Sequence, residues 1–316
     1  ITDGICFGTE SGNLSDFGIA ARIIDEEPPT YKEILTSSVK NGLSFPSARS
    51  RALLRSLKDS GISLSSDISL PNNILAIEYI RACNHTGMSA QTIKRSDSGY
   101  HNLSLSDTED SMGMCSASAL RNAIYENTKN SRKTDISMFI PYAEPEYLSR
   151  PVSEHHFSMQ LYSKVIGNID CLSDYMDISH DLAMRIRNNI IDFENWTQFI
   201  TLLKTKQYTY TRIQRALLHC MLNIKKYENN CQRYRTPYIR VLGFRKSSSA
   251  LMKQLSLHAS VPVITKPASV HSFPDIYEKT MLAEDIYASE LYEKTRSYVY
   301  GSPCNYNEYT HGMVIT

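Results

Sequence analysis

The sequence contains no run of about 18 apolar residues, the length that a helix needs to cross the hydrocarbon core of a membrane. Its first residues, ITDGICFG, also lack the positively charged start and the apolar centre of a secretory signal. These two absences argue against a membrane-spanning or exported protein. We therefore expect a cytoplasmic protein that has no membrane partner.

Cysteine pairs at metal-binding spacing are missing as well. The seven cysteines are scattered along the 316 residues, and no two of them form a CxxC pair. An odd and widely spaced set is typical of reduced thiols rather than of a disulfide framework or a zinc site. We expect these thiols to pack as small apolar side chains, and the sequence indicates no protein-bound metal site.

The chain does contain enough apolar material for a sizeable core, with 41% apolar residues and a length that suggests two domains. Residues 3–9, DGICFGT, have the pattern of a short buried strand, and residues 92–94 resemble a second one. Apolar residues with helical spacing lie between these strands and dominate from about residue 153 onward. Within the first part, helices are expected over residues 31–40, 46–58 and 72–83.

This pattern predicts an α/β fold for residues 1–150, a partial Rossmann-like domain, followed by a mainly α-helical domain over residues 151–316. Gly8, the asparagine pair Asn72 and Asn73, and Arg95 follow apolar segments of the first domain, and a serine-rich turn runs into a helix near Ser116. Ligands of a parallel, doubly wound sheet bind beyond the carboxyl ends of its strands. We expect these residues to line one nucleotide pocket there.

Two adjacent asparagines, Asn72 and Asn73, follow Pro71 at a helix start. One asparagine would suffice to satisfy free backbone amides of the first turn. The second is either an ordinary surface residue or an amide that faces a ligand at the positive end of the helix. The sequence leaves both interpretations open.

Acidic residues are nearly absent from residues 199–246, which carry eleven lysines and arginines against the single acid Glu228. Five tyrosines are interleaved with these cations: Tyr208, Tyr210, Tyr227, Tyr234 and Tyr238. This combination is typical of proteins that bind RNA, because cations contact the phosphates and aromatic rings stack on unpaired bases. The alternative is a solvated helix face with tyrosines packed beneath it. The size of the charge segregation favours a nucleic-acid partner.

Several strings, in order along most of the chain, resemble the tRNA-Met cytidine acetate ligase family of the HxGH nucleotidyltransferase superfamily. These strings are FGTES at 7–11, GLSFPSAR at 42–49, LPNNILAIEY at 70–79, KRSDSGYH at 94–101, SASALR at 116–121, LLKTKQYTYTRIQR at 202–215, TPYIRVLGF at 236–244 and ITKPAS at 264–269. The resemblance implies an ATP-dependent ligase that forms acetyl-adenylate and acetylates the wobble cytidine of elongator tRNA-Met. Acetate and this tRNA would be its substrates.

The resemblance also implies the residues that bind ATP. Gly8, Asn72 and Arg95 match the family's nucleotide contacts, and SASALR resembles a turn in which Ser116, Ser118 and a following arginine hold phosphates. The arginine of that turn is Arg121. Here Ala and Leu replace Thr and Ile of the superfamily's pattern. A magnesium ion is expected to bridge the phosphates.

The basic segment, residues 199–246, would then hold the tRNA. The candidates for phosphate contacts are Lys206, Arg212, Arg215, Arg235 and Arg240, and those for base stacking are Tyr208, Tyr210 and Tyr238. For each tyrosine taken singly, packing in the core with a satisfied hydroxyl is the competing interpretation.

The sequence departs from the superfamily in one respect: it contains no HxGH. We expect the chain to begin partway through the nucleotide-binding domain, and its catalytic residues are not identified. Whether it is a fragment or a natural truncation is left open. Two other functions therefore compete with the ligase, a catalytically inactive tRNA-binding protein and an adenylyltransferase of the same superfamily.

Overall fold

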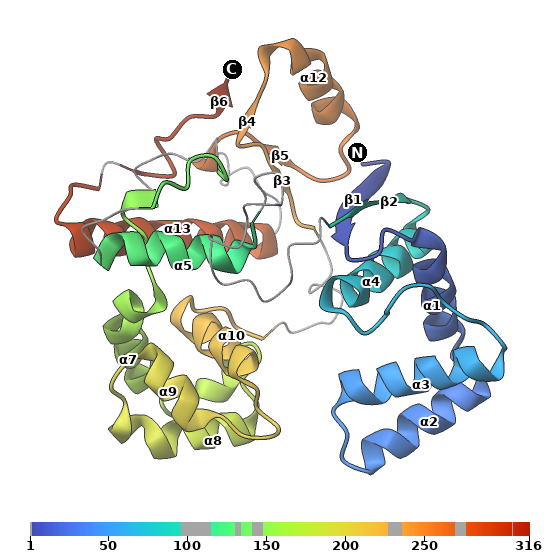
Figure 1. Cartoon of the computed structure of the whole chain (residues 1–316). Helices are drawn as coiled ribbons and strands as arrows, with labels where there is room; N and C mark the ends of the chain where they lie inside the picture. The colour runs from blue at the N-terminus through green and yellow to red at the C-terminus, as the bar shows by residue number, and fades with distance from the viewer. Residues whose placement is uncertain are drawn as a thin grey trace. The chain divides into compact units, whose positions relative to one another are not determined.

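The computed structural model describes residues 2–95, 115–129, 134–140, 148–226, 236–268, 276–304 and 306–316. By its internal contacts the chain forms two compact units, Ile1–Tyr142 and Ala143–Thr316. Figure 1 shows the helices and strands of both units. The prediction of an α/β part followed by a mainly helical part is confirmed. None of the helices in the described ranges combines the length and the apolar character of a membrane span.

The first unit contains two parallel strands, β1 (Gly4–Thr9) and β2 (Ser89–Lys94), and Thr9 lies opposite Lys94 in their register. Parallel strands require a crossover connection rather than a tight turn. Here the connection carries four helices, and a fifth helix follows β2: α1 (Leu14–Glu26), α2 (Pro29–Lys40), α3 (Phe45–Asp59), α4 (Pro71–Thr86) and α5 (Ala117–Lys129).

Local sequence explains where these helices begin and end. The side chain of Asn13 caps α1, because it accepts hydrogen bonds from the backbone amides of Ser15 (3.1 Å) and Asp16 (3.4 Å). Helix α4 begins with Pro71, where a missing amide hydrogen does no harm. It ends at Gly87, whose φ of 73° lies in the left-handed region that favours glycine.

The core of the first unit lies between α1, α3 and α4, with the sheet packed against it. Phe17 and Ile77 are among its buried members, and the ring of Tyr31 from α2 joins them. Phe7 of β1 packs on this core, whereas the next residue, Gly8, is exposed. Because successive residues of a strand point to opposite faces, the Gly8 side of β1 is turned away from the core.

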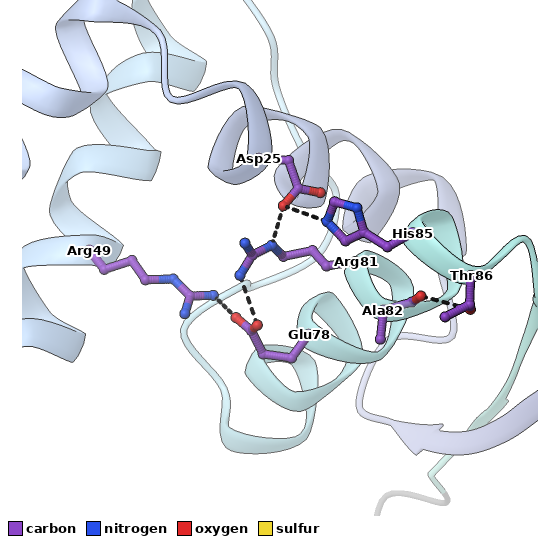
Figure 2. A network of polar contacts seen from close by, with 7 residues as sticks. All are labelled: Asp25, Arg49, Glu78, Arg81, Ala82, His85 and Thr86. Atoms are coloured by element: carbon purple, nitrogen blue, oxygen red, sulfur yellow. Dashed lines mark hydrogen bonds and ion pairs between the residues drawn. The ribbon is translucent and has the colours of Figure 1, made fainter. Parts of the chain in front are cut away.

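A network of charged side chains ties three helices of this unit together (Figure 2). Arg81 of α4 donates from Nε to Asp25 of α1 at 2.6 Å and from Nη1 to Glu78 of α4 at 2.9 Å. Arg49 of α3 also donates to Glu78, and Nε2 of His85 lies 3.5 Å from Asp25. Since Arg81 touches two carboxylates, it joins α1 to α4, and Glu78 extends the network to α3.

The second unit contains a helical core. Four helices contribute to this core: α7 (Ser158–Gly167), α8 (His180–Asn189), α9 (Trp196–Leu203) and α10 (Tyr210–Met221). Two further helices follow in the described part of the chain, α12 (Ser249–His258) and α13 (Ile276–Tyr300). Single turns of 3₁₀ helix occur at η2 (Glu154–Phe157), η3 (Leu172–Asp174), η4 (Ile190–Asp192) and η5 (Lys246–Ser248).

Short strands are also present in the second unit, and the sequence did not predict them. Strand β3 (Ile239–Arg240) pairs in parallel with β5 (Val263–Ile264), and β4 (Gly243–Phe244) pairs in parallel with β6 (Val314–Ile315). Each strand has two residues, so it contains no alternation that a pattern search could detect.

Candidate functional site

The carboxyl end of β1 is held to β2 by a buried threonine. Oγ1 of Thr9 lies 2.7 Å from Oγ1 of Thr92 and accepts a hydrogen bond from the amide of Gly12 at 3.0 Å. The φ of Gly12 is 75°, and a Cβ there would lie 3.1 Å from Cβ of Lys94. Thr9 and Gly12 therefore fix a tight exit from β1 beside the end of β2.

Gly8 precedes this exit and leaves the outer side of the strand open. A Cβ built on Gly8 would meet no atom of the described residues closer than the carbonyl oxygen of Ile93, at 4.0 Å. Packing within the described residues therefore does not require a glycine here. The absence of a side chain gives a ligand access to the backbone at the end of β1.

Arg95 follows β2 and continues its pairing with β1. Its backbone amide donates to the carbonyl oxygen of Thr9 at 2.8 Å, and its side chain is partly buried. Arg95 is thus one hydrogen bond away from the residue that follows Gly8. The structure brings these two predicted site residues together at one edge of the sheet.

Asn73 is the buried member of the asparagine pair, with none of its surface exposed. Its Oδ1 accepts a hydrogen bond from the amide of Glu10 at 3.0 Å, and its Nδ2 donates to the carbonyl oxygen of Asp67 at 2.8 Å. The side chain therefore connects the turn after β1 to the segment before α4. The Asn73 side chain therefore has a structural function, and both polar atoms of this buried carboxamide have hydrogen-bond partners.

Asn72 is partly exposed and is held by Glu10. Oε1 of Glu10 accepts hydrogen bonds from the backbone amide of Asn72 at 3.2 Å and from its Nδ2 at 2.9 Å. Neither asparagine caps α4, because the N-cap position is Leu70, which makes no side-chain hydrogen bond. Instead, the Glu10 carboxylate satisfies an amide in the first turn of α4 from outside the helix, where the helix dipole favours a negative charge.

A second acid supports the same region from α1. Asp16 is buried, and its Oδ2 accepts hydrogen bonds from Oγ of Ser65 at 2.7 Å and from the amide of Ser66 at 2.8 Å. Burial raises the pKa of Asp16, but the hydrogen bonds from Ser65 and Ser66 bring that pKa below its ordinary value. The ionised carboxylate holds the segment before α4 against the start of α1.

Ser116 begins the serine-rich turn at the start of α5. Its Oγ accepts a hydrogen bond from the amide of Ala119 at 3.1 Å, so Ser116 caps the start of α5. Nη2 of Arg121 donates to Oγ of Ser118 at 3.4 Å. The predicted contacts of Ser116, Ser118 and Arg121 with phosphates stay a prediction.

Three of the five predicted cations of the second unit lie at the start of α10 or just before it. Lys206 is exposed in the segment before this helix, and Arg212 and Arg215 are exposed on successive turns of it. The guanidinium of Arg212 lies 4.8 Å from the ring centre of Tyr208. Nε of Arg215 lies 2.6 Å from Asp177, and the Arg215 side chain is 59% exposed. These three cations reach solvent on one part of the second unit.

Arg240 has a different environment. It forms an ion pair with Glu308, which is buried. Arg235 lies outside the described residues. The predicted phosphate contacts of Arg235 and Arg240 stay predictions, and a contact by Arg240 would compete with a buried carboxylate.

The predicted stacking tyrosines are anchored in the protein. Tyr208 is buried, and its hydroxyl lies 2.7 Å from Oγ of Ser179. Tyr210 is partly buried against the helical core. The hydroxyl of Tyr238 donates a hydrogen bond to Asp285. The pKa of Tyr238 is raised, mainly by burial and secondly by this hydrogen bond. The competing interpretation, core packing with a satisfied hydroxyl, describes Tyr208 in this structure.

Sequence reasoning missed Thr9, Glu10 and Asn73 as parts of the site. Glu10 lies in the string FGTES directly after the first strand, and its position next to a strand end was the available signal. Among the described residues, no group of three or more His, Cys, Asp or Glu side chains is placed to hold a metal ion.

Comparison with known proteins identifies sequences that are similar to this chain. A family model described as HIGH Nucleotidyl Transferase matches residues 2–302. A tRNA(Met) cytidine acetate ligase of Clostridium perfringens is 30% identical over 300 residues, which cover 92% of this chain and 71% of the relative. The corresponding ligase of Halothermothrix orenii is 32% identical over 309 residues, which cover 92% of this chain and 72% of the relative.

Two solved structures share the fold. The crystal structure of Thermotoga maritima TmcAL bound with alpha-thio ATP has a TM-score of 0.78 and 23% sequence identity, and the match covers 100% of this chain and 76% of that one. The apo form of the same protein has a TM-score of 0.81 and 24% identity, with 77% of that chain covered.

Proposed function

We propose that this chain activates acetate with ATP, because it belongs to the HIGH nucleotidyl transferase family. Within that family it belongs to the tRNA(Met) cytidine acetate ligases. In this proposal, acetyl-adenylate forms at the carboxyl edge of β1 and β2. The acetyl group then passes to the exocyclic amine of the wobble cytidine in elongator tRNA(Met). The observation that carries the proposal is the convergence of Gly8, Asn72 and Arg95 on this edge in a chain of that family.

A nucleoside triphosphate fits the chemistry of this edge. The open backbone at Gly8 admits a ligand, and Asn72 lies in the first turn of α4, where the helix dipole is positive. The guanidinium of Arg95 supplies forked, permanently charged donors for phosphate oxygens. Ser116, Ser118 and Arg121 complete the phosphate contacts in this proposal.

Activation of a carboxylate requires two anions, acetate and the triphosphate, to be held in line. It also requires donors where negative charge accumulates, on the α-phosphate and on the departing pyrophosphate. Arg95 meets the second requirement. A magnesium ion is expected to accompany the triphosphate in this proposal.

The tRNA would lie against the basic segment of the second unit. Lys206, Arg212 and Arg215 are exposed and suit contacts with phosphates. Tyr210 and Tyr238 are the candidates for stacking on unpaired bases, whereas Tyr208 is buried and would support Arg212 from below. Arg235 and Arg240 complete the predicted set of phosphate contacts.

The competing candidate is a tRNA-binding protein without ligase activity. The two candidates differ in one measurable reaction, the acetate-dependent exchange of labelled pyrophosphate into ATP. The ligase catalyses this exchange with acetate and not with glycine or without a carboxylate. Binding of tRNA(Met) without any exchange would contradict the ligase and support the second candidate.

A further inference from the structure

The hydrogen bonds of Glu10 determine which atom Asn72 presents to a ligand. An ionised carboxylate only accepts hydrogen bonds, so the Asn72 amide must turn its Nδ2 toward Oε1 of Glu10, at 2.9 Å. The other amide atom, Oδ1, has no hydrogen-bond partner among the described residues. Asn72 is only partly buried, so this oxygen is available at the start of α4.

This orientation is strongly constrained. The backbone amide of Asn72 donates to the same Oε1 at 3.2 Å, so two donors of one residue converge on one carboxylate oxygen. The other carboxylate oxygen, Oε2, is buried and accepts no hydrogen bond among the described residues. Rotating the Asn72 amide would replace a donor by an acceptor beside a carboxylate whose other oxygen has no partner among the described residues.

The position of Glu10 is fixed in turn by the buried Asn73. Oδ1 of Asn73 accepts the hydrogen bond of the Glu10 amide, at 3.0 Å, and its Nδ2 is bound to Asp67. The backbone that carries the carboxylate and the helix that carries Asn72 are therefore joined through a side chain with no exposed surface. Glu10, Asn72 and Asn73 form one hydrogen-bonded unit at the end of β1.

From this geometry we infer that Asn72 reads the nucleoside part of the ligand through its Oδ1, and that Glu10 is the positioning residue that makes Asn72 an acceptor. A phosphate at neutral pH offers acceptors, which an amide oxygen does not bind. The donors of an adenosine nucleotide are its ribose hydroxyls and its exocyclic amine. The inference rests on the proposed function only in that a nucleotide occupies this edge.

The test measures equilibrium binding of four ligands to the chain by calorimetry. The ligands are ATP, 2′-deoxy-ATP, 3′-deoxy-ATP and purine riboside triphosphate, which lacks the exocyclic amine. Loss of one hydrogen bond weakens binding about 3- to 10-fold. We expect one of the three analogues to bind more weakly than ATP by this factor, and that analogue identifies the donor that Asn72 accepts.

Two variants then separate positioning from packing. In Asn72→Ala and in Glu10→Ala, ATP should bind about 3- to 10-fold more weakly and the discriminated analogue should bind as well as ATP. In Glu10→Gln, discrimination should persist, because the Gln oxygen can still accept from Asn72. Glu26→Ala, at an exposed position of α1, is the matched control and should behave as the unchanged chain.

The affinity for inorganic tripolyphosphate distinguishes positioning of Asn72 from a general structural defect, because such a defect would weaken the binding of tripolyphosphate as well as of ATP. The tripolyphosphate affinity should be unchanged in Glu10→Ala, because the inference assigns Asn72 to the nucleoside. Equal loss of ATP and tripolyphosphate binding would overturn the inference, and so would discrimination that survives Glu10→Ala. If the unchanged chain binds ATP and all three analogues equally, the inference fails while the proposed function stands. If it binds no ATP, both fail.

Discussion

At the scale of single residues, the site depends on where charge and hydrogen-bond donors are placed around the end of β1. The backbone of Arg95 and the start of α4 at Asn72 come to this edge from two different segments. Glu10 and Asp16 are acids whose hydrogen-bond donors come from the segment before α4 and from its first turn. Each acid accepts at least two hydrogen bonds from this region. The acids therefore hold the turn after β1, the segment before α4 and the start of α4 together.

Replacement of Arg95 by alanine should abolish adenylate formation. The charged, forked donor is lost at the position where the proposal puts phosphate charge, and removal of such a donor lowers rates by about 100- to 1000-fold. Arg95→Lys should recover only part of the rate, because an ammonium group cannot bind a phosphate in the bidentate way. Acetate-dependent pyrophosphate exchange measures the effect. An Arg95→Ala variant with a normal exchange rate would contradict the assignment.

The lowered pKa of Asp16 predicts a pH dependence of stability. A carboxyl whose pKa is lower in the folded state stabilises the protein above its unfolded-state pKa of about 3.9, and this stabilisation is lost as the pH falls through the folded-state pKa. Asp16→Asn should therefore lower the free energy of unfolding at pH 7 by roughly 1 kcal/mol. The difference from the unchanged chain should shrink below about pH 4.

Urea unfolding at several pH values measures this difference. Asp170→Asn is the control, since the Asp170 side chain is 79% exposed. Asp170 forms an exposed ion pair with Arg187, and such a pair contributes little to the free energy of unfolding. A stability difference for Asp16→Asn that stays constant between pH 7 and pH 3 would show that the carboxylate charge is not involved.

At the scale of elements, the first unit is an α/β crossover whose helices are joined by polar links as well as by the core. The charged network places Arg81 of α4 between acids of α1 and α4, and Asn73 links α4 to the exit of β1. Helix α4 therefore carries both Asn72, which we propose to face the ligand, and the contacts that fix the position of the helix. Changes far from the edge of the sheet can still move Asn72 through this helix.

Arg81→Met should destabilise the first unit by about 1–3 kcal/mol, because Asp25 and Glu78 lose charge-assisted hydrogen bonds in a partly buried position. Methionine keeps much of the apolar stem of arginine. The matched control is Arg55→Met, which breaks the exposed pair of Arg55 with Asp59 four residues later in α3. Such pairs contribute about 0.3–0.5 kcal/mol. Equal changes in the two unfolding midpoints would contradict the distinction.

At the scale of the whole molecule, the proposal divides the work between two compact units. The nucleotide residues lie in Ile1–Tyr142 and the described cations proposed for tRNA lie in Ala143–Thr316. Each unit has its own buried core. Variants of one unit should therefore affect one half-reaction and spare the other.

The double variant Arg212→Ala with Arg215→Ala should weaken tRNA(Met) binding and leave acetate-dependent pyrophosphate exchange unchanged. Removal of two phosphate contacts should reduce the slope of log affinity against log salt by about 1.4 to 1.8. Titration of the tRNA at several salt concentrations measures this slope. Arg187→Ala, on the exposed surface of α8, is the control for a change of charge alone. Equal losses in binding and in exchange would contradict the division of labour.

Much of this organisation was readable in the sequence. The order of strand, helices and strand follows from apolar spacing, proline and glycine signals, and the capping serine at residue 116 lies where a helix start requires an acceptor. The family follows from strings such as LPNNILAIEY, and the relatives and the fold comparison agree with it. These features are local, because a few neighbouring residues determine each of them.

Only the tertiary structure decided how the two asparagines differ. In the sequence they are adjacent and chemically identical, but Asn73 points into the protein and bonds to Glu10 and Asp67, whereas Asn72 lies at the surface with its amide turned by Glu10. Partners 62 and 63 residues away along the chain make this difference. Composition and spacing do not encode such contacts, because they arise when the crossover brings the start of α4 back to the end of β1.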